Sequence, residues 1–360
     1  PVESFMYFYL HDAFCNEIST SIIQSKQDCI DWITYTYFYR RIHANPSFYG
    51  VKDTSPLGIS AYLTELVEET LKDLTDASMI EVEEEEESQE DVISPLNGSL
   101  ISSYHNVPFP SMHTFMLSLS KSSNMKAILE ILSSASVFES IPIRREDSST
   151  LSKLHDRVPL KFSVTANSES TAFKTFVLLQ AYFSRLKLPQ DLEIDLKEIL
   201  KKSVPLVNAI VDILSGEGNL NATTAMDVSQ MLIQGVWDTD SPLKQVPCFN
   251  SQILNKCVEK NIETVYDIMS LEDEEREEII DLNNKEMYRV ANFVNSYPNV
   301  ELQYAIDLSD PIISNEPKSI VVTLARDDEP ESLEVVSDKF PFKKTENWWI
   351  VIGEASSKQL

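Results

Sequence analysis

The chain has 360 residues, of which 30 are basic and 57 acidic, giving a formal charge of −27. Hydrophobic residues make up 42%, which suffices for real cores and argues against a globally disordered chain. The negative charge opposes binding to phosphate backbones, except through a local basic strip. The length predicts two to four domains. No apolar run approaches the roughly 18 residues of a membrane helix, and PVESFMYFYLHD does not look like a signal peptide.

Glycine is scarce, with seven residues in the whole chain, and this argues against several enzyme classes. The one close pair, Gly216 and Gly218, is followed neither by a third glycine nor by Gly-Lys-Ser/Thr. A phosphate cradle made of backbone N–H groups is therefore not expected. A GxSxG nucleophile turn is also absent from the sequence. We expect no catalytic residue and no bound cofactor in this chain.

Histidine and cysteine show no spacing typical of a metal site. The histidines never pair at i, i+4, and the cysteines form no CxxC. We therefore expect no metal ligands and predict reduced thiols, as in a nuclear or cytosolic protein. The residues concerned are His11, His43, His105, His113 and His155, and Cys15, Cys29, Cys248 and Cys257.

Residues 1–104 read as three helices followed by a hairpin, which predicts a winged helix. The second helix contains DWITYTYFYRRIHANPSFYG at 31–50 and is apolar nearly all round, so we expect it to be buried. Ser25 is placed to cap its start, with Asp28 three residues on. Pro46 pushes Asn45 out of the helical region and ends it.

The third helix, at about 59–77, is the one that would enter a DNA groove in a winged helix. Its outer face carries glutamate and aspartate rather than the arginine, lysine, asparagine or glutamine that reads base edges, so we expect no DNA reading by it. The hairpin that follows has a glutamate-rich tip at 81–91. A charge run of this kind is typical of a solvated loop, and an electrostatic contact with a basic partner is the alternative.

The rest of the chain divides into three predicted domains. Residues 105–242 show apolar spacing of three and four between prolines and predict a helical bundle. Residues 243–298 predict a smaller helix-loop-helix domain. From 299 to 360 the period changes to two, and four predicted strands make roughly half of an immunoglobulin-like or fibronectin-III-like β-sandwich, which looks truncated. The fold class is mainly α, multidomain, with a C-terminal β part.

Long segments of the chain resemble a known family in order. They are PVESF, DWITYTYFYRRIHANPSFYG, PLNGSLISSY, ILEILSSASVFESIPIR, FVLLQAYFSRLKL, SQMLIQGVWDTDSPLKQVP and ENWWIVIGE. Together they resemble the Sec-sixty-three homology unit that follows the ATPase core in Ski-two-like helicases, and they cover nearly the whole chain. Within that family they are most similar to the C-terminal cassette of the double-cassette spliceosomal type (the Brr-two type).

The resemblance implies a winged helix, a bundle, a helix-loop-helix and a sandwich in this order. It also implies that ATP and magnesium bind in a helicase core outside this chain, and that one bundle helix, here 196–214, lies beside the threaded strand as a ratchet. Active members carry a basic residue where this sequence has Pro205 and Leu206, followed by Asn208. Lys201 and Lys202 stand one turn earlier, so we expect weak or no RNA contact.

The family motif residues Asp31, Arg40, Arg41, Asn45 and Pro46 are expected to be mainly structural, with the arginines in ion pairs or on carbonyls. Tryptophans such as Trp348 and Trp349 lie in a hydrophobic core more often than they anchor a protein interface. Because alternation places only one of them inside a sandwich, the other is a candidate protein interface.

The resemblance implies a non-catalytic interaction and regulatory module of a nuclear, spliceosomal RNA helicase. Its partners would be other spliceosomal proteins, including the large scaffold protein, and the helicase cassettes of the same polypeptide, with no membrane. One alternative is an RNA-guiding ratchet unit of an active cassette. A second is the translocation protein of the endoplasmic reticulum that shares this homology unit.

Overall fold

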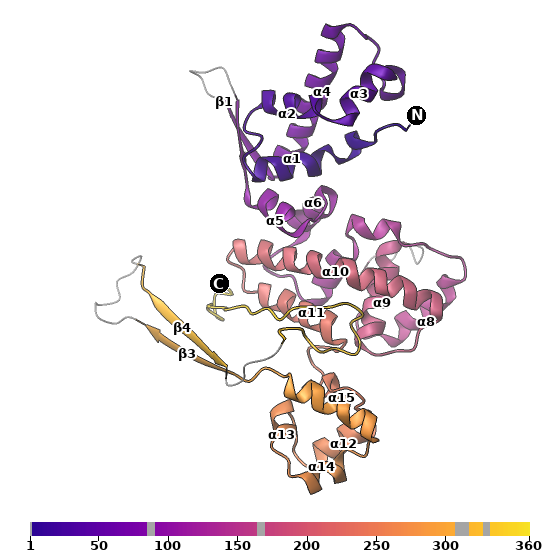
Figure 1. The fold of residues 1–360 in the computed structure, drawn as a ribbon, viewed down its shortest axis with the longest axis vertical. Helices are drawn as coiled ribbons and strands as arrows, with labels where there is room; N and C mark the ends of the chain where they lie inside the picture. Colours follow the sequence, from indigo (N-terminus) through magenta and orange to yellow (C-terminus); the bar gives the residue numbers. More distant parts are fainter. Residues whose placement is uncertain (1, 85–90, 164–169, 307–316, 327–331) are drawn as a thin grey trace. The chain divides into compact units, whose positions relative to one another are not determined.

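The computed structural model describes residues 2–84, 91–163, 170–306, 317–326 and 332–360, and within these it is mainly helical (Figure 1). The chain forms two compact units. Unit 1 comprises Pro1–Leu232 with Ile350–Leu360, and unit 2 comprises Ile233–Trp349. Unit 2 is thus an insertion between two parts of unit 1. The finer division at residues 104, 242 and 298 stays a prediction.

The first part of unit 1 has the helices and hairpin of a winged helix, as predicted. Its helical elements are η1 (Met6–Tyr9), α1 (Leu10–Ser19), α2 (Lys26–Thr34), α3 (Tyr37–Ala44), η2 (Pro46–Tyr49) and α4 (Pro56–Asp76). The wing is an antiparallel hairpin of β1 (Ile80–Glu84) and β2 (Asp91–Pro95), in which Val82 pairs with Ile93. The glutamate-rich tip predicted at 81–91 lies largely outside the described residues, at 85–90.

The single buried helix predicted across 31–45 is wrong, because the chain breaks between α2 and α3. Thr36 leaves the helix with an extended backbone, and its hydroxyl accepts a hydrogen bond from the Tyr39 N–H, which starts a new helix. The break turns two tyrosines outward, with Tyr35 89% and Tyr37 53% exposed. The predicted ends are right, since Ser25 caps α2 and α3 stops before Asn45 and Pro46.

The second part of unit 1 is a helical bundle around one fully buried helix. Its elements are α5 (Asn97–His105), α6 (Phe109–Ser118), α7 (Met125–Ser133), η3 (Ser136–Ser140), α8 (Asp147–Arg157), α9 (Thr171–Phe183), α10 (Gln190–Gly216) and α11 (Ala222–Gln234). Every residue of α9 from Phe173 to Phe183 is buried. The helices α7, α8 and α10 pack around α9, while α5 packs on both α1 and α10. A helix that is apolar all round needs such cover on every side.

The last residues of the chain return to unit 1 and pair with the turn after α10. The Leu220 N–H donates to the Lys358 carbonyl at 3.1 Å, and the Leu360 N–H donates to the Gly218 carbonyl at 2.9 Å. Gly218 has a positive φ of 63°, which a glycine adopts without strain. The tail is therefore held by backbone hydrogen bonds to unit 1.

Unit 2 contains a small helical core. It contains η4 (Pro242–Gln245), α12 (Ser251–Glu259), α13 (Val265–Met269), α14 (Asp273–Ile279) and α15 (Asn284–Asn295). Thr264 with Asp267 and Asn283 with Glu286 form capping boxes at the starts of α13 and α15. Apolar residues from all of these helices form one buried cluster that includes Ile253, Val265, Ile279 and Phe293.

Two of the four strands predicted after residue 299 form, and two do not. The strands β3 (Val300–Ile306) and β4 (Ile320–Arg326) pair antiparallel, with Tyr304 opposite Val322. The segments predicted as strands at 332–338 and 347–354 contribute only isolated bridges, Glu334 to Thr345 and Glu354 to Gln359. Their backbone hydrogen bonds are isolated, such as the one from the Val335 N–H to the Lys344 carbonyl at 2.8 Å, and do not continue into a ladder. The immunoglobulin-like sandwich is not confirmed.

Candidate functional site

The motif at 31–50 is organised around the carboxylate of Glu3. Arg41 donates to both Glu3 oxygens, from Nε at 3.0 Å and from Nη2 at 2.6 Å. The Asn45 amide and the Tyr49 hydroxyl donate to the same carboxylate at 3.0 and 2.9 Å. We call these four residues the Glu3 cluster. They join the N-terminal segment to the end of α3 and to η2, so Arg41 and Asn45 act in holding the local fold.

The Glu3 cluster favours the ionised carboxylate. Hydrogen bonds from Arg41 first, and then from Asn45, lower the pKa of Glu3 from its ordinary 4.5 to about 2. A group with a lowered pKa in the folded state contributes stability that is fully present above its ordinary pKa. That contribution is lost as the pH falls from about 4.5 towards 2.

Glu3→Gln should therefore destabilise unit 1 at neutral pH, and the difference from the native chain should shrink as the pH falls from 5 to about 2. The check is the thermal unfolding midpoint of both chains across this pH range. Glu69→Gln is the matched control, because Glu69 is exposed on α4, and it should leave the midpoint unchanged. A Glu3→Gln effect that is the same at every pH would contradict the assignment.

The other motif residues lie on the surface of α2 and α3. The Asp31 carboxylate accepts from the Gln27 amide at 2.8 Å, which is a local contact along α2. Arg40 is exposed and, in the part of the chain that the structure describes, has neither an ion pair nor a hydrogen bond. The two adjacent arginines therefore differ in their surroundings. Arg41 is held by two hydrogen bonds to Glu3, whereas Arg40 faces solvent.

The outer face of α4 is acidic, as predicted. Glu65, Glu68, Glu69, Asp73 and Asp76 are all exposed. His11 contacts Asp73 at 3.0 Å. A surface of this charge repels nucleic-acid phosphates and suits a basic polypeptide.

The helix predicted at 196–214 to be the ratchet helix is part of α10, which runs without interruption through Pro205. Pro205 has no N–H to donate to the Lys201 carbonyl. Lys202 donates from Nζ to the Val137 carbonyl at 3.0 Å and to the Ser140 hydroxyl at 2.7 Å, so it is engaged at the end of η3. Lys201 is exposed, while Pro205 and Asn208 are half-buried. Of the two lysines at this position, Lys201 alone points a charge into solvent.

A buried charge cluster that the sequence analysis missed fixes the start of α10. Lys174 is fully buried on α9 and contacts Asp147 at 2.6 Å and Asp195 at 2.7 Å. Arg144 donates two hydrogen bonds to Asp195, at 2.6 and 3.1 Å. Burial raises the pKa of Asp195, but the hydrogen bonds from Arg144 and Lys174 outweigh it, so the net pKa is lowered. We call these four residues the Lys174 cluster.

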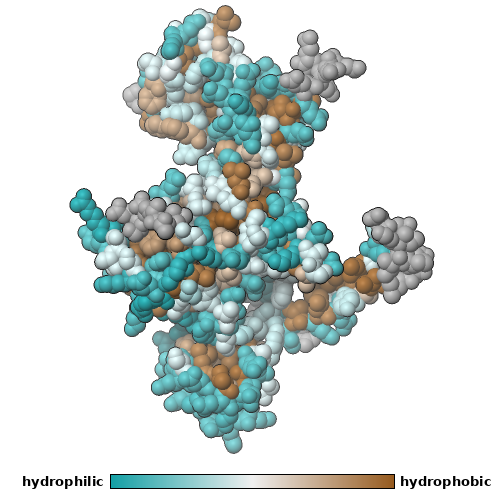
Figure 2. All heavy atoms as spheres, turned by 180° about the vertical axis from the view of Figure 1, so that it is seen from behind, coloured by the Kyte–Doolittle hydropathy of each residue, from teal (hydrophilic) through white to brown (hydrophobic). Residues whose placement is uncertain are grey.

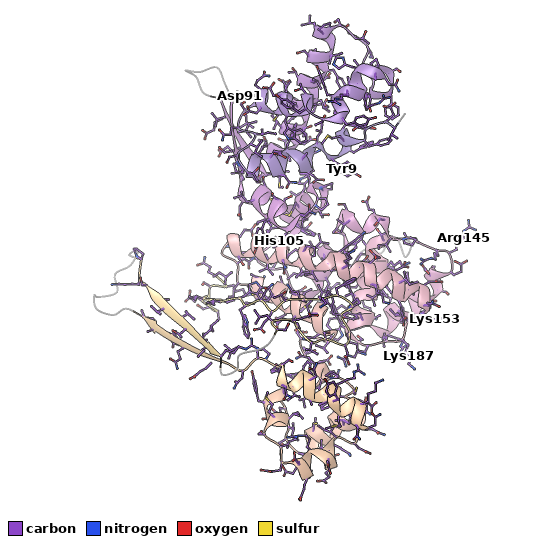
Figure 3. All side chains as sticks on the ribbon, viewed as in Figure 1. Tyr9, Asp91, His105, Arg145, Lys153 and Lys187 are labelled. Atoms are coloured by element: carbon purple, nitrogen blue, oxygen red, sulfur yellow. The ribbon has the colours of Figure 1, made fainter. Side chains whose placement is uncertain are left out.

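The sequence did carry a signal for the Lys174 cluster. Lys174 is the one charged residue in TAFKTFVLLQAYF, a helix apolar on all sides. A lysine there must either be paired or lose its charge. The helices α5 and α10 are joined in a similar but more exposed way, by His105 and Asp212 at 2.6 Å (Figure 3).

The tryptophan pair is not divided between core and surface. Trp348 is 53% and Trp349 is 39% exposed, so the prediction that one of them is inside is wrong. The Trp348 ring nitrogen donates to Glu346 at 2.6 Å, and the same carboxylate pairs with Arg326 of β4 at 2.9 Å. The alternation argument failed because no regular strand forms at these residues.

One face of the β3–β4 hairpin is apolar and uncovered. Leu302, Tyr304 and Ile306 of β3 lie opposite Leu324, Val322 and Ile320 of β4. Their exposed fractions include 61% for Leu302 and 73% for Tyr304. Figure 2 shows hydrophobic residues gathered along this hairpin. An apolar sheet face of this kind is typical of an interface or of one half of a sandwich.

The described residues hold no cluster of three histidine, cysteine, aspartate or glutamate side chains arranged for a metal ion. The four cysteines are free thiols, as predicted, and burial raises the pKa of Cys15 and Cys29 to about 12. The thiolates of Cys15 and Cys29 are therefore scarce at neutral pH, and these two side chains are inert core residues. Among the same residues, none of the helices has the length and apolarity of a membrane span.

The chain combines a winged helix, a helical bundle and a small set of helices in unit 2. Residues 95–360 match the model of the Sec63 Brl domain, and residues 3–84 match that of a winged helix-turn-helix domain. The chain belongs to the Sec63 Brl domain family.

Several curated relatives match along the whole chain. "Pre-mRNA-splicing factor brr2" of Schizosaccharomyces pombe is 41% identical over 98% of the chain and 16% of the relative. The human "U5 small nuclear ribonucleoprotein 200 kDa helicase" is 39% identical over 100% of the chain and 17% of the relative. "DExH-box ATP-dependent RNA helicase DExH12" of Arabidopsis thaliana is 38% identical over 100% and 17%. The chain thus spans about one sixth of the length of these relatives, and it is homologous to one region of them.

Proposed function

We propose that the chain is a non-catalytic protein-interaction and regulatory region of a spliceosomal RNA helicase acting in pre-mRNA splicing. The relatives named as a splicing factor and a U5 ribonucleoprotein helicase support the setting. ATP and magnesium would bind, and snRNA would be unwound, in another part of the polypeptide. The setting also makes the nucleus the place of action.

The observation that carries the non-catalytic role is the state of α10 at the ratchet position. Lys202 is engaged by the Val137 carbonyl and Ser140. The family resemblance implies a strand-contacting basic residue where this chain has Pro205 and Leu206. Single-stranded RNA is usually held by a basic groove with aromatic stacking platforms. At this position α10 presents one free lysine and no aromatic ring.

Protein contacts are supported by two exposed apolar surfaces. Phe5, Phe8 and Phe48 lie together at ring distances of 6.4 and 6.0 Å, and all three are substantially exposed. We assign this aromatic group to a contact with the helicase cassettes of the same polypeptide. The uncovered hairpin face would be one half of the immunoglobulin-like sandwich, and the acidic face of α4 would take basic surfaces of spliceosomal proteins, such as the large scaffold protein.

The alternative function is an RNA-guiding ratchet unit, and Lys201 favours it. Lys201 is exposed on α10 and is without a partner among the described residues. It could contact a phosphate if a strand passed one turn before the position expected from the family.

The test is the fluorescence anisotropy of labelled single-stranded oligouridine titrated with the chain at two salt concentrations. The proposed function predicts a dissociation constant weaker than about 100 μM even at low salt, where electrostatic attraction is strongest. Micromolar binding that weakens with salt and is lost in Lys201→Glu, but not in the control Lys72→Glu on α4, would establish the ratchet function instead.

The proposed binding of spliceosomal proteins is tested by a separate retention experiment. Immobilised chain should retain identified U5 ribonucleoprotein proteins from a splicing extract at moderate salt. If it retains none of them, the proposed function fails.

A further inference from the structure

The surface at the start of α3 combines the exposed Tyr35 and the half-buried Tyr39 with an unpaired cation. We define it by Tyr35, Tyr39, Arg40 and His43 and call it the α3 surface. Tyr39 and His43 are one turn apart on α3, and their rings meet edge to face at 4.6 Å. Arg40 lies three residues before His43, so the two side chains share one face of the helix. Tyr35 stands just before Thr36, the residue that caps this helix.

The contacts that hold the local fold at α3 come from other side chains. Arg41 and the Glu3 cluster tie α3 to the N-terminal segment, and Phe38 and Ile42 fill the core beneath it. Tyr35 is 89% exposed. Arg40, exposed as well, makes neither an ion pair nor a hydrogen bond to any described residue. Tyrosine and arginine in this state are the residue types that most often dominate the binding energy of protein interfaces.

We propose that the α3 surface docks an acidic polypeptide segment of a partner protein. This inference rests on the proposed function and names one of its contact sites. The Arg40 guanidinium presents a fork of N–H donors that fits a carboxylate in two hydrogen bonds, and the exposed rings supply apolar area beside it. The acidic face of α4 would repel such a segment, whereas the Arg40 charge on α3 attracts it.

The same observations disfavour RNA as the occupant. A strand needs several cations along its path, and its affinity comes largely from displacing counterions from successive phosphates. The α3 surface has one permanent cation, because Arg41 is already neutralised by Glu3. A single carboxylate of a peptide fits this one cation, whereas the successive phosphates of a strand would leave most of their charge unpaired.

The experiment places the photoreactive residue benzoylphenylalanine at position 35 of the full chain and irradiates it in a splicing extract. The control carries the same residue at Tyr104, which is 84% exposed on α5. We expect position 35 to crosslink to one protein, at a peptide that contains several aspartate or glutamate residues. Adding Arg40→Glu should reduce that crosslink about tenfold. Arg145→Glu, a change at an exposed arginine of the bundle, should leave it intact (Figure 3).

Three results would overturn the inference. They are a crosslink to RNA, a crosslink no stronger than that from position 104, and a yield that Arg40→Glu does not change. The retention of U5 proteins tests the proposed function independently of the α3 surface. If the native chain retains them but position 35 does not crosslink, the function stands and the surface is wrong.

Discussion

Replacing Lys174 with methionine should lower the free energy of unfolding of unit 1 by about 3–5 kcal/mol. Methionine fills a similar volume, so the loss is one of charge and hydrogen bonding. Lys174 also donates to the Pro142 carbonyl at 2.8 Å, so the lysine satisfies three oxygens at once. Without it, Asp147 and Asp195 share Arg144 as their remaining cation, inside a site whose carboxylates are less than one tenth exposed.

The measurement is the thermal unfolding midpoint, followed by a signal from the bundle. A loss of this size corresponds to a drop of about 6–20 °C for a unit of this length. Lys126→Met is the matched control, because Lys126 forms a longer, more exposed pair with Glu130 at 3.9 Å. It should cost about 0.5 kcal/mol or less.

A double variant makes the test specific to charge. Lys174→Met with Asp195→Leu removes one cation and one anion, and it should recover part of the lost stability. If the single variant unfolds near the native midpoint, or if the double variant is worse than the sum of both single changes, the cluster does not work through charge pairing.

Local sequence rules predicted much of the winged helix, and their failures have physical causes. Ser25 and Pro46 marked element ends correctly because caps and prolines act within a few residues. The break at Thr36 was missed because TYTYFY is apolar enough to continue a helix. A threonine cap in the middle of such a run is decided by the packing of Phe38 and Ile42.

For the candidate site too, some residue roles could be predicted from the sequence and others could not. The role of Arg41 could be anticipated as an ion pair, but its partner Glu3 lies 38 residues away and nothing in the local pattern selects it. Lys174 was detectable as an anomaly within an apolar helix, whereas Asp147 and Asp195 were not. The prediction that one of Trp348 and Trp349 is buried failed, because period-two alternation predicts burial only where a sheet forms.

The role of the α10 lysines can be assessed only from the sequence and the structure together. The family resemblance implies a basic residue where the sequence has Pro205 and Leu206, and the sequence alone leaves Lys201 and Lys202 equivalent. The structure separates the two lysines, since Lys202 bonds to η3 and Lys201 does not. The choice between an interaction module and a ratchet unit therefore narrows to one side chain, and Lys201 is the residue to change first.

Gln180→Met should destabilise the bundle by about 2–4 kcal/mol, because two backbone groups lose their partners at once. Gln180 is fully buried on α9, and its side-chain oxygen accepts from the Leu160 N–H at 2.9 Å. Its amide donates to the Leu160 carbonyl at 3.1 Å. This pair of hydrogen bonds pins the segment after α8 against α9. Methionine fits the space but can bond neither group.

The direct readout is hydrogen exchange at the Leu160 amide, which should speed up by about 30-fold or more for a loss of at least 2 kcal/mol. Gln27→Met is the matched control, since Gln27 is exposed on α2 and bonds only to Asp31. It should change neither the exchange at Leu160 nor the unfolding midpoint. Unchanged protection of Leu160 in Gln180→Met would mean that packing by Phe162 against Phe173 and Phe176 holds this segment without the glutamine.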